Sequence, residues 1–133
     1  MKTSQQLVAE AKAAIKEVDV AQLSAYLQQQ SEPLLIDVRE PAEFTQAHIV
    51  GAVNYPRGVL EMQLPNHPLV AASGCAAEVA LAQLAKQPLY LICRSGARSA
   101  LAAESLLRMG FTDVYSVAGG MVAWQDAGYP VKA

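Results

Sequence analysis

Four short apolar runs, separated by stretches of helical pattern, limit the folds that this chain can adopt. The runs occupy residues 34–38, 52–55, 89–92 and 114–117. The first is almost wholly apolar, as expected of a strand that is covered on both faces. Repeated alternation of buried strands with helices predicts an α/β fold, in which an open parallel sheet carries helices on both faces.

The segments between these runs carry helix signals. Apolar side chains from Leu7 to Ile15 share one face of a first helix, and Asp19 with Gln22 predicts a capping box that opens a second. Further helices are predicted at residues 41–44, 75–86 and 100–109 and after Gly119-Gly120, whereas residues 57–68 show no regular pattern. Neither an internal repeat nor a low-complexity linker divides the chain.

Length and composition indicate one compact domain. The chain has 133 residues, of which 53% are hydrophobic and 17% charged, so it can bury a substantial core. A formal net charge of −2, without a block of Lys or Arg, gives no electrostatic footprint for nucleic acid or an anionic membrane. No apolar stretch reaches the roughly 18 residues of a membrane span, and no apolar signal segment follows Met1, so a cytoplasmic location is expected.

The chain has two cysteines, Cys75 and Cys93. Two cysteines cannot form a disulfide framework, and the sequence has neither a Cys-x-x-Cys pair nor a Cys/His cluster with metal-ligand spacing. This count fits a reducing compartment and a functional thiol, and no metal site is expected.

Cys93 follows the apolar run 89–92 and precedes a helical stretch, in the sequence Cys-Arg-Ser-Gly-Ala-Arg-Ser. At such a junction the N–H groups of the turn and the positive end of the helix dipole can face the sulfur. A thiol held there should lose its proton easily, and the thiolate is the nucleophilic form. Ligands of open parallel sheets bind at the carboxyl ends of the strands, where Cys93 falls. Core packing is the ordinary role of a lone cysteine, but the polar sequence that follows favours a reactive one.

The six residues after Cys93 predict a pocket for an anion. Gly96 permits backbone conformations that are closed to other residues, and successive inward-pointing N–H groups form an anion-binding nest. Two arginines of the loop add positive charge. The predicted binding residues are Arg94, Ser95, Gly96, Ala97, Arg98 and Ser99. The small radius suits a thiolate, a persulfide or a tetrahedral anion such as thiosulfate, and it does not suggest a nucleotide.

The spacing within this loop separates two anion chemistries. Cysteine phosphatases resemble it, but their arginine stands six residues after the cysteine; here that position is Ser99, and the arginine comes one residue earlier, at Arg98. With this tighter loop the chain resembles the rhodanese family of sulfurtransferases. The active loop of that family runs from the cysteine through four residues to a residue that is often Arg or Thr.

The resemblance extends beyond the loop. Residues 35–40, Glu43-Phe44 and 48–54 are similar to the first signature of the family, and residues 117–124 and 128–131 to its last. Ala47 and Val50 stand where the family commonly has Gly and Pro, which affects a turn away from the thiol. The likeness covers about residues 18–133, so residues 1–16 are predicted to be an N-terminal helical extension and residues 17–133 the rhodanese-like domain.

The resemblance implies a rhodanese-like open parallel sheet of about five strands and a ping-pong sulfur transfer. The Cys93 thiolate would attack the outer sulfur of thiosulfate, release sulfite and hold a persulfide cradled by the N–H groups of residues 94–98. The sulfur would then pass to cyanide or a cellular thiol. No metal or organic cofactor is implied.

Other side chains have ordinary interpretations beside functional ones. Asp37 and Arg39 are expected to form a structural ion pair beside the active loop and not to contact substrate. Arg57 either reaches the mouth of the pocket, where it would attract anions, or lies solvated on the surface. His48 is expected to be a hydrogen-bonded turn residue, because an ionised nucleophile needs no general base. Cys75 is expected to pack at a helix start, the alternative being a resolving or relay thiol.

Three alternatives to a thiosulfate sulfurtransferase stay open. One is a persulfide carrier, which would receive its sulfur from a partner protein and show only incidental activity with thiosulfate. A phosphatase or arsenate reductase is disfavoured by the length of the loop. A non-catalytic interaction module is disfavoured by the presence of Cys93 with its full loop.

Overall fold

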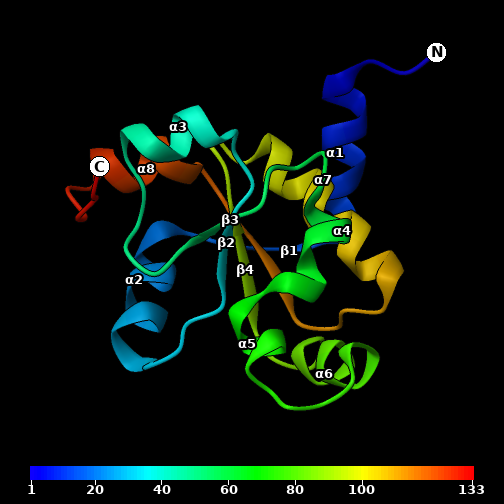
Figure 1. Ribbon diagram of the computed structural model, residues 1–133. Coiled ribbons are helices and arrows are strands. Elements are labelled where there is room, and N and C mark those ends of the chain that lie inside the picture. Colours follow the sequence, from blue (N-terminus) through cyan, green and yellow to red (C-terminus); the bar gives the residue numbers. More distant parts are fainter.

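The computed structural model describes residues 1–133. One five-stranded, all-parallel sheet with strand order β1-β5-β4-β2-β3 forms its centre (Figure 1). The strands are β1 Lys16–Val18, β2 Leu35–Asp37, β3 Val53–Asn54, β4 Leu89–Ile92 and β5 Val114–Val117. The predicted α/β class and the parallel sheet with helices on both faces are confirmed.

Helices cover both faces of this sheet. They are α1 Ser4–Ala14, α2 Val20–Gln29, α3 Pro41–Gln46, α4 Leu60–Gln63, the 3-10 helix η1 Leu64–Asn66, α5 Pro68–Ala71, α6 Ala77–Leu84, α7 Ala97–Met109 and α8 Gly120–Asp126. Side chains of α4 to α7 form one core with the sheet, and side chains of α2 and α8 form the other. Helix α1 lies against α7, on the side of the first core (Figure 1).

The central strands are apolar because both of their faces are buried. In β2, Leu35 belongs to the core with α2 and α8, whereas Ile36 belongs to the core with α4 to α7. Leu91 and Ile92 of β4 divide between the two cores in the same way, and all four side chains are fully buried. Successive side chains of a strand point to opposite faces, so a doubly covered strand needs an unbroken apolar run.

Strand β1 is the strand that the sequence pattern misses. Lys16 and Glu17 are exposed, and the strand pairs on one side only, with β5. An edge strand does not need buried side chains on both faces, and its three residues therefore lack the apolar run that reveals the central strands.

Three further details differ from the sequence-based expectations. Residues 57–68, predicted to be irregular, contain α4 and η1, which are too short to show a helical period. Helix α6 begins at Ala77, so Cys75 lies in an exposed turn, and the expectation that it packs at the start of that helix is wrong. On α1, Ala11 is buried but Leu7 is 47% exposed, so only part of the predicted apolar face packs.

Helix α7 positions the carboxyl end of β4. It begins after Gly96 and ends at Gly110, and both glycines have left-handed backbone angles, with φ of 102° and 107°. The left-handed end predicted at Gly110 is therefore present. Ala100, Ala103 and Leu106 of this helix are buried, so its first turn is fixed relative to the sheet. No helix of the chain combines the length and the apolar character that a membrane crossing requires.

Candidate active site

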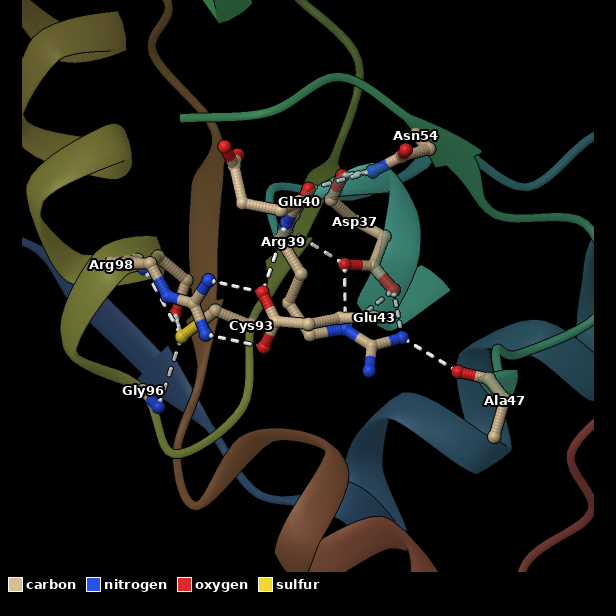
Figure 2. A network of polar contacts seen from close by, with 10 residues as sticks. Asp37, Arg39, Glu40, Glu43, Ala47, Asn54, Cys93, Gly96 and Arg98 are labelled. Atoms are coloured by element: carbon tan, nitrogen blue, oxygen red, sulfur yellow. Dashed lines mark hydrogen bonds and ion pairs between the residues drawn. The ribbon is translucent and has the colours of Figure 1, made fainter. Parts of the chain in front are cut away.

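Cys93 lies between the end of β4 and the start of α7, at the carboxyl edge of the sheet. The residue is 1% exposed. Its sulfur accepts hydrogen bonds from the main-chain N–H groups of Gly96, at 3.1 Å, and Ser99, at 3.3 Å. Figure 2 shows the Gly96 nitrogen turned toward this sulfur. The turn from strand to helix therefore folds its N–H groups back onto the thiol.

Gly96 gives this turn its shape. Its φ of +102° lies in the left-handed region, which side chains of L-residues rarely adopt. A Cβ atom at this position would lie 3.5 Å from the nitrogen of Gly119 and 3.6 Å from the carbonyl oxygen of Val117, at ordinary contact distance. The requirement for glycine therefore comes from the backbone conformation that directs the Gly96 N–H to the sulfur.

The first turn of α8 holds the outer side of the loop. The N–H of Met121 donates to the carbonyl oxygen of Cys93 at 2.8 Å, and the N–H of Val122 donates to that of Arg94 at 3.0 Å. Gly120 allows this approach, because a Cβ atom there would collide with the main chain of both loop residues. Helix α8 thus fixes two carbonyl groups of the loop on its outer side.

Four main-chain N–H groups of the loop have no acceptor within the protein. They belong to Arg94, Ser95, Ala97 and Arg98. The C=O and N–H groups of a trans peptide point in opposite directions, so the first two point away from α8, which binds the carbonyls of the same peptides. Main-chain N–H groups are strong donors, and several of them together form the kind of nest that binds anions.

Two serine hydroxyls lead from the sulfur into the sheet. The Cys93 thiol donates to Ser99 Oγ at 3.4 Å, and Ser99 Oγ lies 2.8 Å from Ser116 Oγ on β5. Both serines are fully buried. When the sulfur is a thiolate, the Ser99 hydroxyl can donate to it and the Ser116 hydroxyl can donate to Ser99. Sequence reasoning missed Ser116, although a hydroxyl in the buried strand beside β4 was a usable signal.

The positive charge expected from Arg98 is balanced by a carboxylate. Its guanidinium donates to both carboxylate oxygens of Glu43 on α3, at 2.7 and 3.0 Å, beside the Cys93 sulfur (Figure 2). The hydrogen bonds from Arg98 lower the pKa of Glu43 to about 2, so the carboxylate is ionised at neutral pH. The same bonds raise the pKa of Arg98. Sequence reasoning gave Glu43 no role, because the pair joins residues 55 positions apart.

A buried ion pair joins the end of β2 to the turn after α3. The guanidinium of Arg39 donates to the carboxylate of Asp37, at 2.8 Å for the shortest contact, and to the carbonyl oxygen of Ala47 at 2.7 Å (Figure 2). The side-chain amide of Asn54 on β3 donates to the carbonyl oxygens of Asp37 and Arg39. The ion pair expected between Asp37 and Arg39 is therefore present. Ala47 has extended backbone, with φ of −165°, which does not need a glycine.

The other residues singled out in the sequence lie farther from the sulfur or on the surface. Arg94 is exposed and makes no ion pair. Arg57 is half-buried, and its Nη1 donates to Glu61 on α4 at 3.4 Å. His48 is the hydrogen-bonded turn residue that was expected, with Nδ1 2.9 Å from the carbonyl oxygen of Phe44. No group of three or more His, Cys, Asp and Glu side chains is placed to hold a metal ion.

Comparison with known proteins places this geometry in a family. A family model for the rhodanese-like domain matches residues 19–127. This chain belongs to the rhodanese-like domain family. The matched region of this rhodanese-like chain begins after α1 and β1 and includes Cys93 with its whole loop.

Two proteins named as sulfurtransferases are similar to this rhodanese-like protein. A sulfurtransferase of Allochromatium vinosum is 32% identical to it over 119 residues, which cover 90% of this chain and 96% of the relative. The chloroplastic thiosulfate sulfurtransferase 16 of Arabidopsis thaliana is 37% identical over 101 residues, which cover 74% of this chain and 78% of the relative.

A solved structure from Rhodopseudomonas palustris has the same fold. It belongs to a protein described as of unknown function and as a possible tyrosine phosphatase, and it superposes with a TM-score of 0.78 at 27% identity. The match covers 99% of this chain and 96% of the other. The rhodanese-like fold and the family predicted from the sequence are confirmed.

Proposed function

We propose that this rhodanese-like protein is a sulfurtransferase that moves a sulfane sulfur from thiosulfate, through a persulfide on Cys93, to cyanide or a thiol. The observation that carries the proposal is a sulfur bonded by two main-chain N–H groups within a loop that offers four more without an acceptor. Relatives named sulfurtransferase and thiosulfate sulfurtransferase support the same reaction class.

In the first half-reaction the Cys93 thiolate attacks the outer sulfur of thiosulfate. The bond between the two thiosulfate sulfurs breaks, and sulfite leaves with the electron pair. The N–H groups of Gly96 and Ser99 stabilise the thiolate before the attack, and the Ser99 hydroxyl adds a third donor. The proposal assigns no general base, because the N–H donors at the sulfur favour the nucleophilic thiolate form.

The persulfide that results carries its negative charge on the outer sulfur. We assign the unpaired N–H groups of Arg94, Ser95, Ala97 and Arg98 to that atom, since they are the donors of the loop that the protein itself leaves free. In the second half-reaction the acceptor attacks the outer sulfur, the bond between the two sulfurs breaks, and the electron pair returns to Cys93. The product is thiocyanate or the persulfide of the acceptor thiol.

The two arginines of the loop take different parts in this proposal. Arg98 is bound to Glu43, so its charge is balanced and its part is to hold the loop beside α3. Arg94 makes no ion pair, so it is the loop arginine with free charge for attracting an anionic donor. Attraction of this kind is screened by salt, and we expect the KM for thiosulfate to rise with ionic strength.

The intact mass of the protein after exposure to thiosulfate tests this proposal. We expect wild type and Cys75→Ser to gain the mass of one sulfur atom, to lose it again on addition of cyanide, and to release sulfite and then thiocyanate. Cys93→Ser should gain nothing. A gain in Cys93→Ser, or its absence in wild type that retains its fold, would contradict the proposal.

Two rate comparisons separate the proposal from its alternatives. Saturable turnover with thiosulfate alone supports a sulfurtransferase, whereas transfer only from a persulfidated donor protein supports a persulfide carrier. Hydrolysis of an aryl phosphate that disappears in Cys93→Ser would support a phosphatase. We expect no such hydrolysis, because the loop places Arg98 one residue too early for the phosphatase pattern and Glu43 occupies its guanidinium.

A further inference from the structure

A pocket of about 250 Å³ opens beside the active loop, between α3 and the first turns of α8. Its polar lining comes from Arg39, Glu43, Gln46, Arg94 and Gln125, and its apolar lining includes Met121 and Val122. A water occupies about 30 Å³ in the liquid, so the pocket has room for about eight. Thiosulfate and cyanide are much smaller than this space.

The charges around this pocket leave one positive charge in excess. Arg39 is paired with Asp37, and Arg98 with Glu43, whose side chain also lines the pocket. Arg94 has no ion-pair partner. The pocket therefore favours an anion although both neighbouring arginines are balanced.

The buried guanidinium of Arg39 offers a free donor to the same pocket. Its Nε and Nη2 are bound to Asp37 and Ala47, but its Nη1 donates to no group of the protein. Figure 2 shows this third nitrogen turned away from both partners. The residue is 7% exposed, and its Nη1 is not among the buried atoms that lack a partner, so this donor is accessible from the pocket. An acceptor atom of a ligand in the pocket would satisfy it.

We propose that this pocket binds the carboxylate-bearing body of a small thiol that accepts sulfur from Cys93. The inference rests on the proposed sulfur transfer and names the class of its acceptor. A carboxylate matches the geometry of guanidinium donors at Arg39 and Arg94, the amides of Gln46 and Gln125 suit further polar groups, and Met121 offers apolar contact for methylenes.

The place of the pocket fits attack on the persulfide. Arg94 belongs to both the pocket and the loop, and Glu43 of α3, which lines the pocket, lies beside the Cys93 sulfur (Figure 2). The inference places the thiol of the bound acceptor at this α3 side of the pocket, next to the outer sulfur. Its thiolate attacks that sulfur, the bond to the Cys93 sulfur breaks, and the electron pair returns to Cys93, so no oxidant or reductant is consumed.

A pair of matched acceptors tests the inference. Mercaptopropionate and mercaptoethanol differ mainly in carrying a carboxylate or a hydroxyl, and the rate of each with a small-molecule persulfide corrects for intrinsic reactivity. At low ionic strength and with thiosulfate as donor, we expect the corrected kcat/KM of wild type to be about tenfold higher for mercaptopropionate, the effect of one charge-assisted contact. Equal values for the two acceptors would overturn the inference.

Two Gln→Glu variants locate the effect. Gln125→Glu adds a negative charge to the pocket on the exposed side of α8, and Gln83→Glu adds the same charge on the exposed face of α6, outside the pocket. We expect Gln125→Glu to remove the preference for mercaptopropionate and Gln83→Glu to keep it. Equal loss in both variants would assign the preference to the net charge of the protein and overturn the inference.

The two half-reactions keep the outcomes distinct. In ping-pong kinetics the kcat/KM values of donor and acceptor are obtained separately. A loss in Gln125→Glu that appears only in the thiosulfate value would make the pocket a donor site and contradict the inference. Formation of the persulfide on Cys93 and its transfer to cyanide would still stand, so the proposed function would survive that result.

Discussion

Cys93 and Cys75 have the same side chain in opposite surroundings. Cys93 is 1% exposed, and its sulfur accepts two main-chain N–H bonds in the turn from β4 to α7. Cys75 is exposed in the turn before α6, and its sulfur lies 3.8 Å from the carbonyl oxygen of Ser73, which can accept a hydrogen bond but cannot donate one. Exposure favours reaction at Cys75, whereas hydrogen-bond donors favour the thiolate at Cys93.

The two turns also use glycine differently. Gly96 and Gly74 both have left-handed φ angles, of 102° and 73°. Gly96 is buried against Gly119 and Val117, whereas nothing lies within 4 Å of a Cβ atom built at Gly74. The same left-handed conformation forms a surface turn next to Cys75, whereas next to Cys93 it forms a loop whose N–H groups face the sulfur. The difference teaches that the surroundings of the turn decide whether its thiol becomes a nucleophile.

The two cysteines should differ most when each thiol is replaced by a serine hydroxyl. We expect Cys93→Ser to lower sulfur transfer from thiosulfate to cyanide by at least about 10³-fold, since it removes the nucleophile. Cys75→Ser should keep the wild-type kcat. Thiocyanate formation measures both variants. Comparable losses in the two would remove the distinction between the cysteines.

Alanine at each turn glycine should separate backbone strain from activity. Gly96→Ala and Gly74→Ala should each lower the free energy of unfolding by about 1–2 kcal/mol, because both place a side chain at positive φ. Only Gly96→Ala should also slow persulfide formation, by about tenfold or more, because its N–H group would turn from the sulfur. Urea unfolding and the burst of sulfite measure the two effects. Normal sulfite release by folded Gly96→Ala would contradict the role of this turn.

A serine near each cysteine allows a finer comparison. Ser116→Ala should slow persulfide formation by about three- to tenfold, because the Ser99 hydroxyl loses the neighbour that orients it toward the sulfur. Ser73→Ala removes the hydroxyl that accepts the N–H of Cys75, and it should leave the rate unchanged. Single-turnover sulfite release gives the rates. Equal rates for wild type and Ser116→Ala would show that only the main-chain N–H groups, and not the serine hydroxyls, act as hydrogen-bond donors to the Cys93 sulfur.

The Glu43–Arg98 pair beside Cys93 should give a small, pH-dependent stabilisation. The pKa of Glu43 is about 2 in the folded protein and 4.5 without these interactions, so its contribution is present above about pH 4.5 and is lost as the pH falls toward 2. Both side chains are about one third exposed, and solvent screening reduces the contribution to about 1 kcal/mol. At neutral pH the free energy of unfolding of wild type should exceed that of Glu43→Gln by this amount.

The same variant has a kinetic consequence. Glu43→Gln leaves the charge of Arg98 unbalanced next to the sulfur, so we expect its KM for thiosulfate to fall by a few-fold at low ionic strength. Urea titrations from pH 7 to pH 3 and initial rates check the two effects. A stability difference that is as large at pH 3 as at pH 7, or a higher KM, would show that Glu43 does not act by balancing Arg98.

The parts of the molecule that depend on local pattern could be predicted from the sequence. The apolar runs of β2, β4 and β5 indicate doubly buried strands, Asp19 with Gln22 caps α2 as predicted, and Gly110 ends α7. The loop after Cys93 is continuous in the chain, so the sequence alone predicts that its N–H groups lie near the sulfur. Strand β1 could not be predicted in this way, because it lies at the edge of the sheet and pairs with β5 only, so it lacks an apolar run.

The missed parts of the site depend on contacts between distant segments. Glu43 neutralises Arg98 from another helix, Ser116 meets Ser99 across neighbouring elements, and Met121 holds the carbonyl of Cys93 from α8. From the sequence, Arg94 and Arg98 were both expected to add positive charge to the pocket. Only the placement of α3 beside α7 shows that one of them is already paired.

Site-resolved alkylation of both cysteines in one sample tests the central claim most directly. The native protein would be treated with iodoacetamide at neutral pH, and peptide masses would follow the two thiols over time. We expect Cys93 to be modified about tenfold faster than Cys75, although it is far less exposed, because its N–H donors favour the thiolate. Faster modification of Cys75 would show that exposure decides reactivity here and that Cys93 is not an activated nucleophile.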